Sequence, residues 1–118
     1  MAHTQPDPVP NGRPSIQSMV RADLATLAGH DDITPTVHAD LGAREQIGIQ
    51  RYGTPLQAHN GRCPLWDAYE EALDLACYLM QARVEGHTAA TALYEQALHM
   101  ACQLRRMIRD RQVADAAL

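Results

Sequence analysis

The sequence has no phenylalanine and no lysine, and aromatic residues make up only 4% of its 118 positions. A core must therefore be built from leucine, alanine, isoleucine, valine and methionine, which suit the packing of helix against helix. Runs of β-branched and aromatic residues with alternating polarity, which would indicate strands, are also missing. We therefore predict an all-α fold of four helices, with a bundle-like core and a long functional loop between the second and third helices.

Other absences limit the classes of function. The formal net charge of −4 argues against nucleic-acid binding, which usually needs a basic face. No apolar run approaches the roughly 18 residues of a membrane span, and the N-terminus lacks the pattern of a signal peptide. The three cysteines, Cys63, Cys77 and Cys102, are odd in number and lack CxxC spacing, so we expect reduced thiols. Together these features predict a soluble cytoplasmic protein that binds neither membranes nor nucleic acids.

Proline content predicts the domain organisation. Residues 1–14 hold four of the seven prolines and almost nothing to bury, so we expect them to form a flexible arm. Residues 15–112 are expected to form one helical domain, and residues 113–118 to fray. Because a domain of this size builds a modest core, we also expect a homo-oligomer, either a dimer or a larger assembly.

Capping residues and glycines predict the helix boundaries. The first helix should begin at Ser15, the second should span about 36–50, the third about 65–84 and the last about 89–112. The expected N-caps and C-terminal stops are Ser15, Gly29, Thr34, Gly53, Gly86 and Thr88. Six apolar residues of the last helix share one stripe that we expect to be buried: Leu93, Ala97, Met100, Leu104, Met107 and Ile108.

The third helix carries the strongest chemical signal. At about 100° per residue, its four carboxylates share one sector roughly 100° wide, and Tyr78 extends that sector by one turn. The carboxylates are Asp67, Glu70, Glu71 and Asp74. The remainder of the helix is apolar, which is typical of a central helix. We therefore expect Leu73 to be buried and Leu73→Ala to cost about 2–5 kcal/mol.

Carboxylates so close together repel one another. A hard divalent cation such as Mg²⁺ would relieve the repulsion, because it takes carboxylate oxygens and keeps waters for a phosphate substrate. The alternative is a solvated acidic face on an ordinary surface helix. Both interpretations remain open from the residues alone.

An irregular connection, residues 51–64, precedes this helix, and loops of that length inside a small domain are usually functional. It carries Arg51, Tyr52, His59, Asn60 and Arg62, which would supply cations for phosphates, an aromatic face for a base, and polar donors. The alternative is a capped loop with solvated arginines.

Two further charged residues lie on the preceding helix. Asp40 and Arg44 share one of its faces, and they are either a surface pair or part of a phosphate or metal site.

The segment 37–81 resembles small proteins encoded by actinobacteria and their phages. The shared motifs are Asp-Leu-x-x-Arg (40–44), Tyr-Gly-Thr-Pro-Leu-Gln (52–57), Asn-Gly-Arg (60–62) and Asp-Ala-Tyr-Glu-Glu-Ala-Leu-Asp-Leu-x-x-Tyr-Leu (67–79). More distantly, Glu71-Ala72-Leu73-Asp74 is similar to the ExxD half of the MazG-like all-α nucleoside triphosphate pyrophosphohydrolases. That resemblance implies helical carboxylates that hold Mg²⁺, or Mn²⁺ in its place, and cleavage between the α- and β-phosphates. The second acidic set of that superfamily, EExxE, is missing, because the preceding helix offers Asp40 and Glu45 in a different spacing.

Three functions are consistent with these features. The first is a Mg²⁺-dependent nucleotide pyrophosphohydrolase in which Glu70, Glu71 and Asp74 are catalytic and hold the metal with Asp67 and Asp40. Its substrate-binding residues would be Arg44, Arg51, Tyr52, His59, Asn60, Arg62 and Tyr78. The second is a non-catalytic protein that sequesters a nucleotide. The third is a helical protein-interaction module whose acidic stripe pairs with a basic partner.

Overall fold

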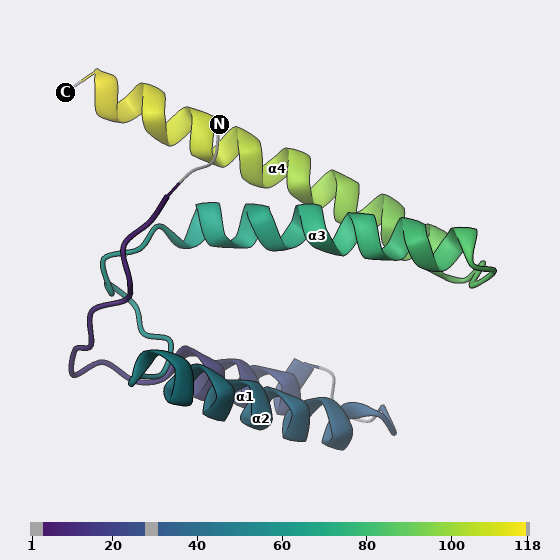
Figure 1. Cartoon of the computed structure of the whole chain (residues 1–118), viewed down its shortest axis with the longest axis horizontal. Helices are drawn as coiled ribbons and strands as arrows, with labels where there is room; N and C mark the ends of the chain where they lie inside the picture. The colour runs from purple at the N-terminus through teal and green to yellow at the C-terminus, as the bar shows by residue number, and fades with distance from the viewer. Residues whose placement is uncertain (1–3, 28–30, 118) are drawn as a thin grey trace. The chain divides into compact units, whose positions relative to one another are not determined.

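The computed structural model describes residues 4–27 and 31–117, and within them the chain forms four α-helices (Figure 1). They are α1 (Ile16–Leu27), α2 (Thr34–Tyr52), α3 (Pro64–Val84) and α4 (Ala90–Ala116). The described residues contain no strand, and their one isolated β-bridge joins Ser15 and Gln57. The all-α prediction, with four helices and a long loop between the second and third, is confirmed. None of the helices in the described ranges combines the length and the apolar character needed to cross a membrane.

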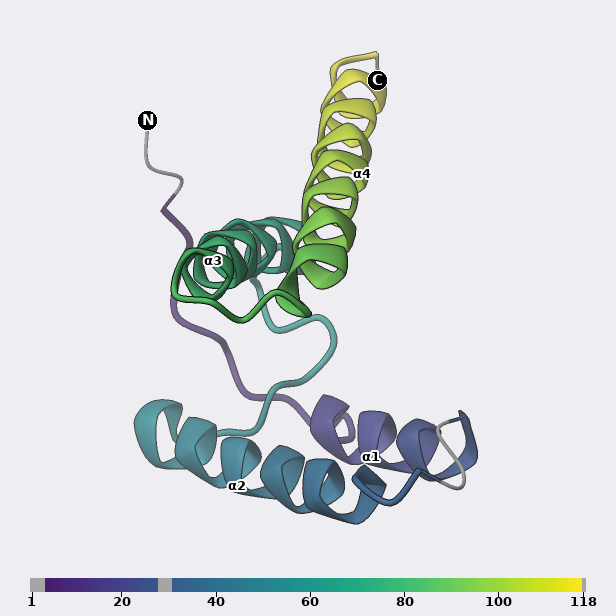
Figure 2. The ribbon, with the colours of Figure 1, turned by 90° about the vertical axis from the view of Figure 1, so that its right-hand side faces the viewer.

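The chain divides into two compact units, Met1–Arg62 and Cys63–Leu118. In the first, which we call the polar unit, α1 packs on α2. In the second, which we call the apolar unit, α3 and α4 form a hairpin and pack against each other (Figure 2).

The start of α1 agrees with the sequence. The Ser15 hydroxyl accepts a hydrogen bond from the N–H of Ser18 at 3.2 Å, and the Ser18 hydroxyl donates to the Ser15 carbonyl at 2.7 Å. Ser15 is therefore the expected N-cap. The predicted end of this helix, Gly29, lies outside the described residues.

Two other predicted N-caps are wrong. The N-cap of α2 is Ile33 rather than Thr34, because the Asp31 carboxylate accepts the N–H of Ile33 at 3.1 Å and forms a turn that begins the helix earlier. The N-cap of α4 is Ala89 rather than Thr88, and it makes no side-chain capping bond.

The glycine stops predicted after α2 and α3 are confirmed. Gly53 ends α2 in the left-handed region with φ +74°, and Gly86 follows α3 with φ +106°. Beyond α3, the N–H of His87 donates to the Ala82 carbonyl at 2.9 Å and the N–H of Gly86 donates to the Arg83 carbonyl at 3.1 Å. This pair of bonds is the Schellman motif, which requires a residue with positive φ where glycine stands.

The core of the apolar unit is built mainly from alanine. Its buried residues are Ala72, Ala76, Ala90, Ala97, Ala101 and Ile108. Small side chains let two helix axes approach closely, so α3 and α4 pack through short contacts.

The predicted stripe of α4 is therefore only partly right. Ala97 and Ile108 are buried, but Leu93, Met100 and Met107 are 53%, 48% and 52% exposed. These three lie about 80° around the helix from the alanine line, which faces α3. Leu73, expected to be buried, is 41% exposed, because α4 covers one face of α3 and Leu73 lies beside that face.

The polar unit buries a different kind of residue. Its buried side chains are Glu45, Thr54, Gln57 and Asn60. Three of the four belong to the connection after α2, which is therefore a structured loop with polar groups inside it.

Candidate functional site

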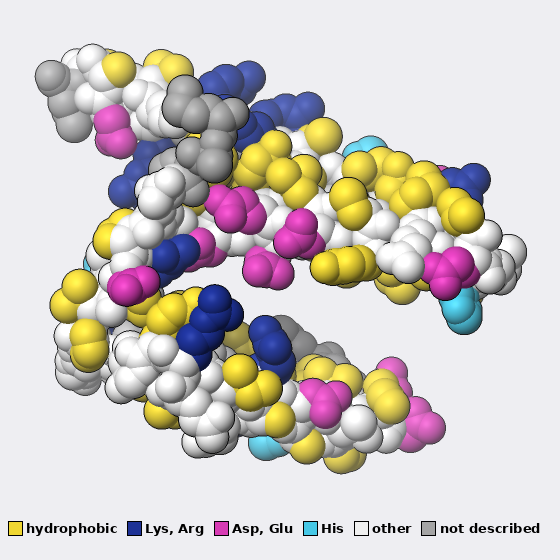
Figure 3. Space-filling view, viewed as in Figure 1, with side chains coloured by type: hydrophobic (Ala, Val, Ile, Leu, Met, Phe, Trp, Pro, Cys, Tyr) yellow, Lys and Arg dark blue, Asp and Glu magenta, His cyan; other side chains and the backbone are white. Residues whose placement is uncertain are grey.

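The acidic stripe of α3 lies on the exposed side of the hairpin. Glu70, Glu71 and Asp74 are exposed, whereas Ala72 and Ala76 on the opposite face are buried against α4. Figure 3 shows acidic side chains gathered on one side of α3, with hydrophobic side chains beside them along the hairpin. Across the described ranges, no ion pair or hydrogen bond engages Glu70, Glu71 or Asp74. Among the described residues, no partner therefore compensates their mutual repulsion.

Carboxylate oxygens suit Mg²⁺ or Mn²⁺, but the side chains of the stripe are not gathered around a point. Within residues 4–27 and 31–117, no group of three or more His, Cys, Asp or Glu residues could hold a metal ion. Asp67 is half-buried at the start of α3, and Asp40 is exposed on α2, in the polar unit. The carboxylate oxygens of the stripe fit a hard cation, but their side chains in this structure do not converge on one.

The predicted ligand-binding residues around the end of α2 are exposed. The guanidinium carbon of Arg51 lies 5.2 Å from the centre of the Tyr52 ring, a cation–π distance. Arg44 is exposed about two turns earlier on α2, and Tyr78 is 68% exposed on α3. Arg51 and Tyr52 thus offer a charge and an aromatic face next to each other.

His59 adopts a backbone conformation that side chains rarely take. Its φ is +56°, and among the described residues it is the one non-glycine with positive φ. Such a conformation costs about 1 kcal/mol or more and is maintained where surrounding contacts determine it. The imidazole is exposed at the tip of the loop.

Asn60 and Arg62 have structural partners. Asn60 is buried, its Oδ1 accepts the N–H of Arg62 at 3.1 Å, and its carbonyl accepts the N–H of Val9 at 2.8 Å. Arg62 Nη1 donates to the Pro6 carbonyl at 2.6 Å. These two residues therefore connect the loop to the N-terminal segment.

The importance of Gln57 could not be predicted from the sequence. Gln57 is the last residue of the motif Tyr-Gly-Thr-Pro-Leu-Gln (52–57), and nothing in the spacing of that motif indicates a role for it. Its partners Asn11 and Arg13 lie more than forty residues away in sequence. Spacing patterns detect contacts within one element, so a contact between the arm and the loop has no signal of that kind.

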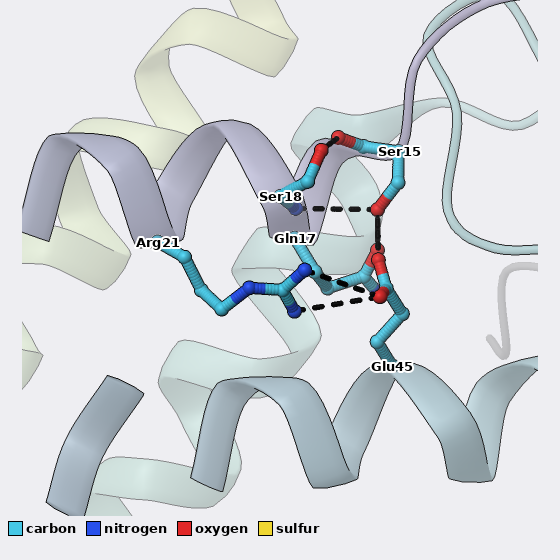
Figure 4. Close-up of polar contacts among 5 residues, drawn as sticks. All are labelled: Ser15, Gln17, Ser18, Arg21 and Glu45. Carbon is cyan, nitrogen blue, oxygen red and sulfur yellow. Dashed lines mark hydrogen bonds and ion pairs between the residues drawn. The ribbon is translucent and has the colours of Figure 1, made fainter. Parts of the chain in front are cut away.

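Glu45 is the buried carboxylate of the polar unit (Figure 4). The Ser15 hydroxyl donates a hydrogen bond to its Oε2, and Arg21 Nη2 lies 3.3 Å from its Oε1. The hydrogen bond from Ser15, together with the charge and hydrogen bond of Arg21, lowers the pKa of Glu45, although desolvation opposes the shift. Glu45 thus links α1 to α2 as a carboxylate.

One surface hollow of the apolar unit lies on α4, away from the acidic stripe of α3. Cys102, Arg105, Arg106 and Arg109 of α4 line this shallow hollow of about 410 Å³. The guanidinium carbon of Arg105 lies 5.2 Å from the Trp66 ring centre. Because one helix supplies all four residues, the hollow is an open surface rather than an enclosed site.

These features define an all-α protein with an exposed acidic face on α3 and exposed basic and aromatic groups around the end of α2. Comparison with protein-family models, with characterised proteins and with solved structures finds no match.

Proposed function

We propose that this chain is a Mg²⁺-dependent, nucleoside triphosphate pyrophosphohydrolase-like protein. The observation that carries the proposal is the unpaired stripe of Glu70, Glu71 and Asp74 on the exposed side of α3. Three carboxylates at this spacing would accept a magnesium ion that arrives with a triphosphate, because such ions keep phosphate and water ligands. The ion, or Mn²⁺ in its place, would neutralise phosphate charge and activate a water molecule.

The residues that we propose to contact the phosphates and the base are exposed on α2 and on the connection that follows it. Arg44 and Arg51 would bind phosphates, where arginine geometry favours bidentate contacts. Tyr52 and His59 would contact the base or sugar. Tyr78 on α3 stays a prediction as a substrate-binding residue, Asp67 on α3 and Asp40 on α2 stay predictions as metal ligands, and Asn60 and Arg62 are proposed as residues that shape the loop.

A second candidate, a non-catalytic nucleotide binder, is favoured by one observation. Of the two α2 carboxylates that could replace the missing EExxE set, Glu45 is already engaged by Ser15 and Arg21. A protein with half of the acidic set would bind a nucleotide without hydrolysing it.

A homo-oligomer is also proposed, with a helical protein-interaction module as the third candidate. The support is apolar surface on the hairpin: Leu73, Leu75, Leu93, Met100 and Met107 are each at least 41% exposed. Leu93, Met100 and Met107 recur every seven residues, the spacing with which one helix packs along another.

The test is thermal melting against a panel of nucleoside triphosphates, with and without Mg²⁺, with pyrophosphate release measured in the same wells. A ligand present at 100 times its dissociation constant stabilises a protein by about 2.7 kcal/mol. The enzyme predicts Mg²⁺-dependent stabilisation with pyrophosphate release, and both should be lost in Glu71→Gln but kept in Glu95→Gln, a matched change at an exposed site on α4.

Stabilisation without release would instead establish the sequestering binder. No response to any nucleotide would exclude both nucleotide functions and leave the interaction module.

A further inference from the structure

We propose that residues 9–13 form a strap that holds residues 54–62 in their ligand-binding conformation, and that Gln57 is the positioning residue that locks this strap. The ligand part of this inference rests on the proposed function. The strap itself rests on contacts between the arm and the loop that the sequence did not predict. Below, residues 54–62 are called the loop.

The side-chain amide of Gln57 is saturated with hydrogen bonds to the strap and the loop. Its Nε2 donates to the carbonyls of Asn11 and Arg13 at 2.6 and 2.7 Å. Its Oε1 accepts the N–H of Asn11 and the hydroxyl of Thr54, both at 3.1 Å. Gln57 is 7% exposed, so each of these bonds replaces water that cannot reach the amide, and losing one leaves a buried polar group unpaired.

Asn11 makes the matching contacts from the side of the strap. Its Nδ2 donates to the carbonyls of Ala58 and His59 at 3.0 and 3.2 Å, and its Oδ1 accepts the N–H of Arg13 at 2.9 Å. Asn11 therefore contacts the backbone immediately beside the strained His59. A contact to the carbonyl of His59 helps to fix the positive φ of that residue.

Two backbone hydrogen bonds also join the N-terminal segment to the loop, one from within the strap and one from the start of α1. The N–H of Val9 donates to the Asn60 carbonyl, and the N–H of Ile16 donates to the Leu56 carbonyl, both at 2.8 Å. The loop is thus bonded to the N-terminal segment from residue 56 to residue 60. Without the strap, the buried side-chain amide of Gln57 and the backbone carbonyl of Asn60 would have to find water, and the loop would lose the contacts that determine its conformation.

Two groups that we propose to bind the ligand adjoin the bonds of the strap: His59 lies within the loop, and Arg51 and Tyr52 precede the loop at the end of α2. A binding loop that is ordered in advance avoids the entropic cost of ordering on contact with a ligand. Releasing the strap should therefore weaken ligand binding while leaving the helices intact.

The experiment uses amide hydrogen exchange in the full chain, followed by NMR. In Gln57→Glu, a carboxylate oxygen would face the two carbonyls that Nε2 now contacts, so the strap should be repelled. We expect the amides of Val9, Asn11 and Ile16 to exchange at least tenfold faster than in the wild type, with α-helical circular dichroism unchanged. Gln46→Glu, the same charge change at an exposed position of α2, should leave all three rates as they are.

A second variant changes the strap residue Asn11 instead of Gln57 in the loop. Asn11→Asp places a carboxylate against the carbonyls of Ala58 and His59 and should have the same effect on exchange. Because Asn11 is only half-buried, this variant keeps the test decisive even if Gln57→Glu unfolds its unit. Unchanged exchange in a folded variant would overturn the strap.

Ligand affinity then separates the strap from the proposed function. The probe is the nucleoside triphosphate that most stabilises the wild type, titrated with Mg²⁺ by calorimetry. We expect at least tenfold weaker binding in Gln57→Glu and Asn11→Asp and no change in Gln46→Glu. Faster exchange with unchanged or tighter binding would overturn the positioning role. If no triphosphate binds the wild type, the proposed function fails and the positioning role fails with it, whereas exchange still decides the strap.

Discussion

The two units of this chain are both helical hairpins, yet they are held together by opposite kinds of side chain. In the described part of the polar unit, every buried residue is polar: Glu45, Thr54, Gln57 and Asn60. In the described part of the apolar unit, every buried residue is apolar, and five of the six are alanine. The helices of the apolar unit pack through small apolar side chains, whereas the polar unit depends on hydrogen bonds between specific donors and acceptors.

The two kinds of buried side chain predict which amino-acid substitutions each unit tolerates. Apolar packing is non-directional and depends on volume, so the apolar unit should respond to changes in side-chain size. Hydrogen bonds depend on geometry and on complete pairing, so the polar unit should respond to isosteric changes of charge that leave size unaltered.

The largest effect should come from Ile108→Ala. Ile108 is 3% exposed and is the one large side chain among the buried residues described in the apolar unit. Removing it should cost about 2–5 kcal/mol. Urea unfolding followed by the fluorescence of Trp66, the single tryptophan of the chain, reports this unit directly. Val113→Ala, at a position 64% exposed on the same helix, should change stability by less than about 0.5 kcal/mol.

A somewhat smaller effect is expected from Ala97→Leu. Ala97 is 1% exposed between α3 and α4, so three added carbons have no space and should cost about 1–3 kcal/mol. The control is Ala92→Leu, the same change at an exposed position of α4. Equal stability of Ala97→Leu and the wild type in the same urea unfolding assay would mean that the helices are not in close contact there.

Much of the fold could be predicted from the sequence, because its signals are local. Gly53 and Gly86 end helices through their positive φ, and Ser15 caps α1 through a hydroxyl three residues from its partner. The caps at Thr34 and Thr88 failed because neighbouring turns began those helices elsewhere. The burial of leucines failed for a different reason: periodicity indicates which residues share a face, and it does not say which face a neighbour covers.

The candidate site was predictable in part. The acidic stripe is exposed on one side of α3, as its spacing indicates, since the stripe depends on helical periodicity alone. The roles of Gln57 and Asn11 could not be predicted, because their contacts join segments more than forty residues apart. Whether the stripe holds a metal depends on side-chain positions that periodicity does not determine.

Leu73→Ala tests whether the exposed flank of α3 contributes less to stability than the buried residues of the apolar unit. Since Leu73 is 41% exposed in the chain, the substitution should cost about 1 kcal/mol or less, below the 2–5 kcal/mol expected for a buried leucine. A homo-oligomer that covers this flank would raise the cost and make melting depend on protein concentration. Melting at several concentrations, paired with sedimentation, measures both quantities. A large cost with no dependence on concentration would contradict the exposed position of Leu73.

The smallest effect, a pH dependence at Glu45, should affect the polar unit alone. The folded pKa of Glu45 is lowered by Ser15 and Arg21, so its ionised form stabilises the fold above the ordinary glutamate pKa. That stabilisation is lost as the pH falls through the lowered folded pKa. Glu45→Gln should therefore be less stable than the wild type near neutral pH, and the difference should shrink on acidification. Amide exchange in α1 and α2 measures the polar unit, and Trp66 fluorescence should show no matching change in the apolar unit. A difference that stays constant from pH 7 to pH 3 would mean that the Glu45 carboxylate contributes nothing as a charge, and the contrast between the two units would then rest on Gln57 and its neighbours.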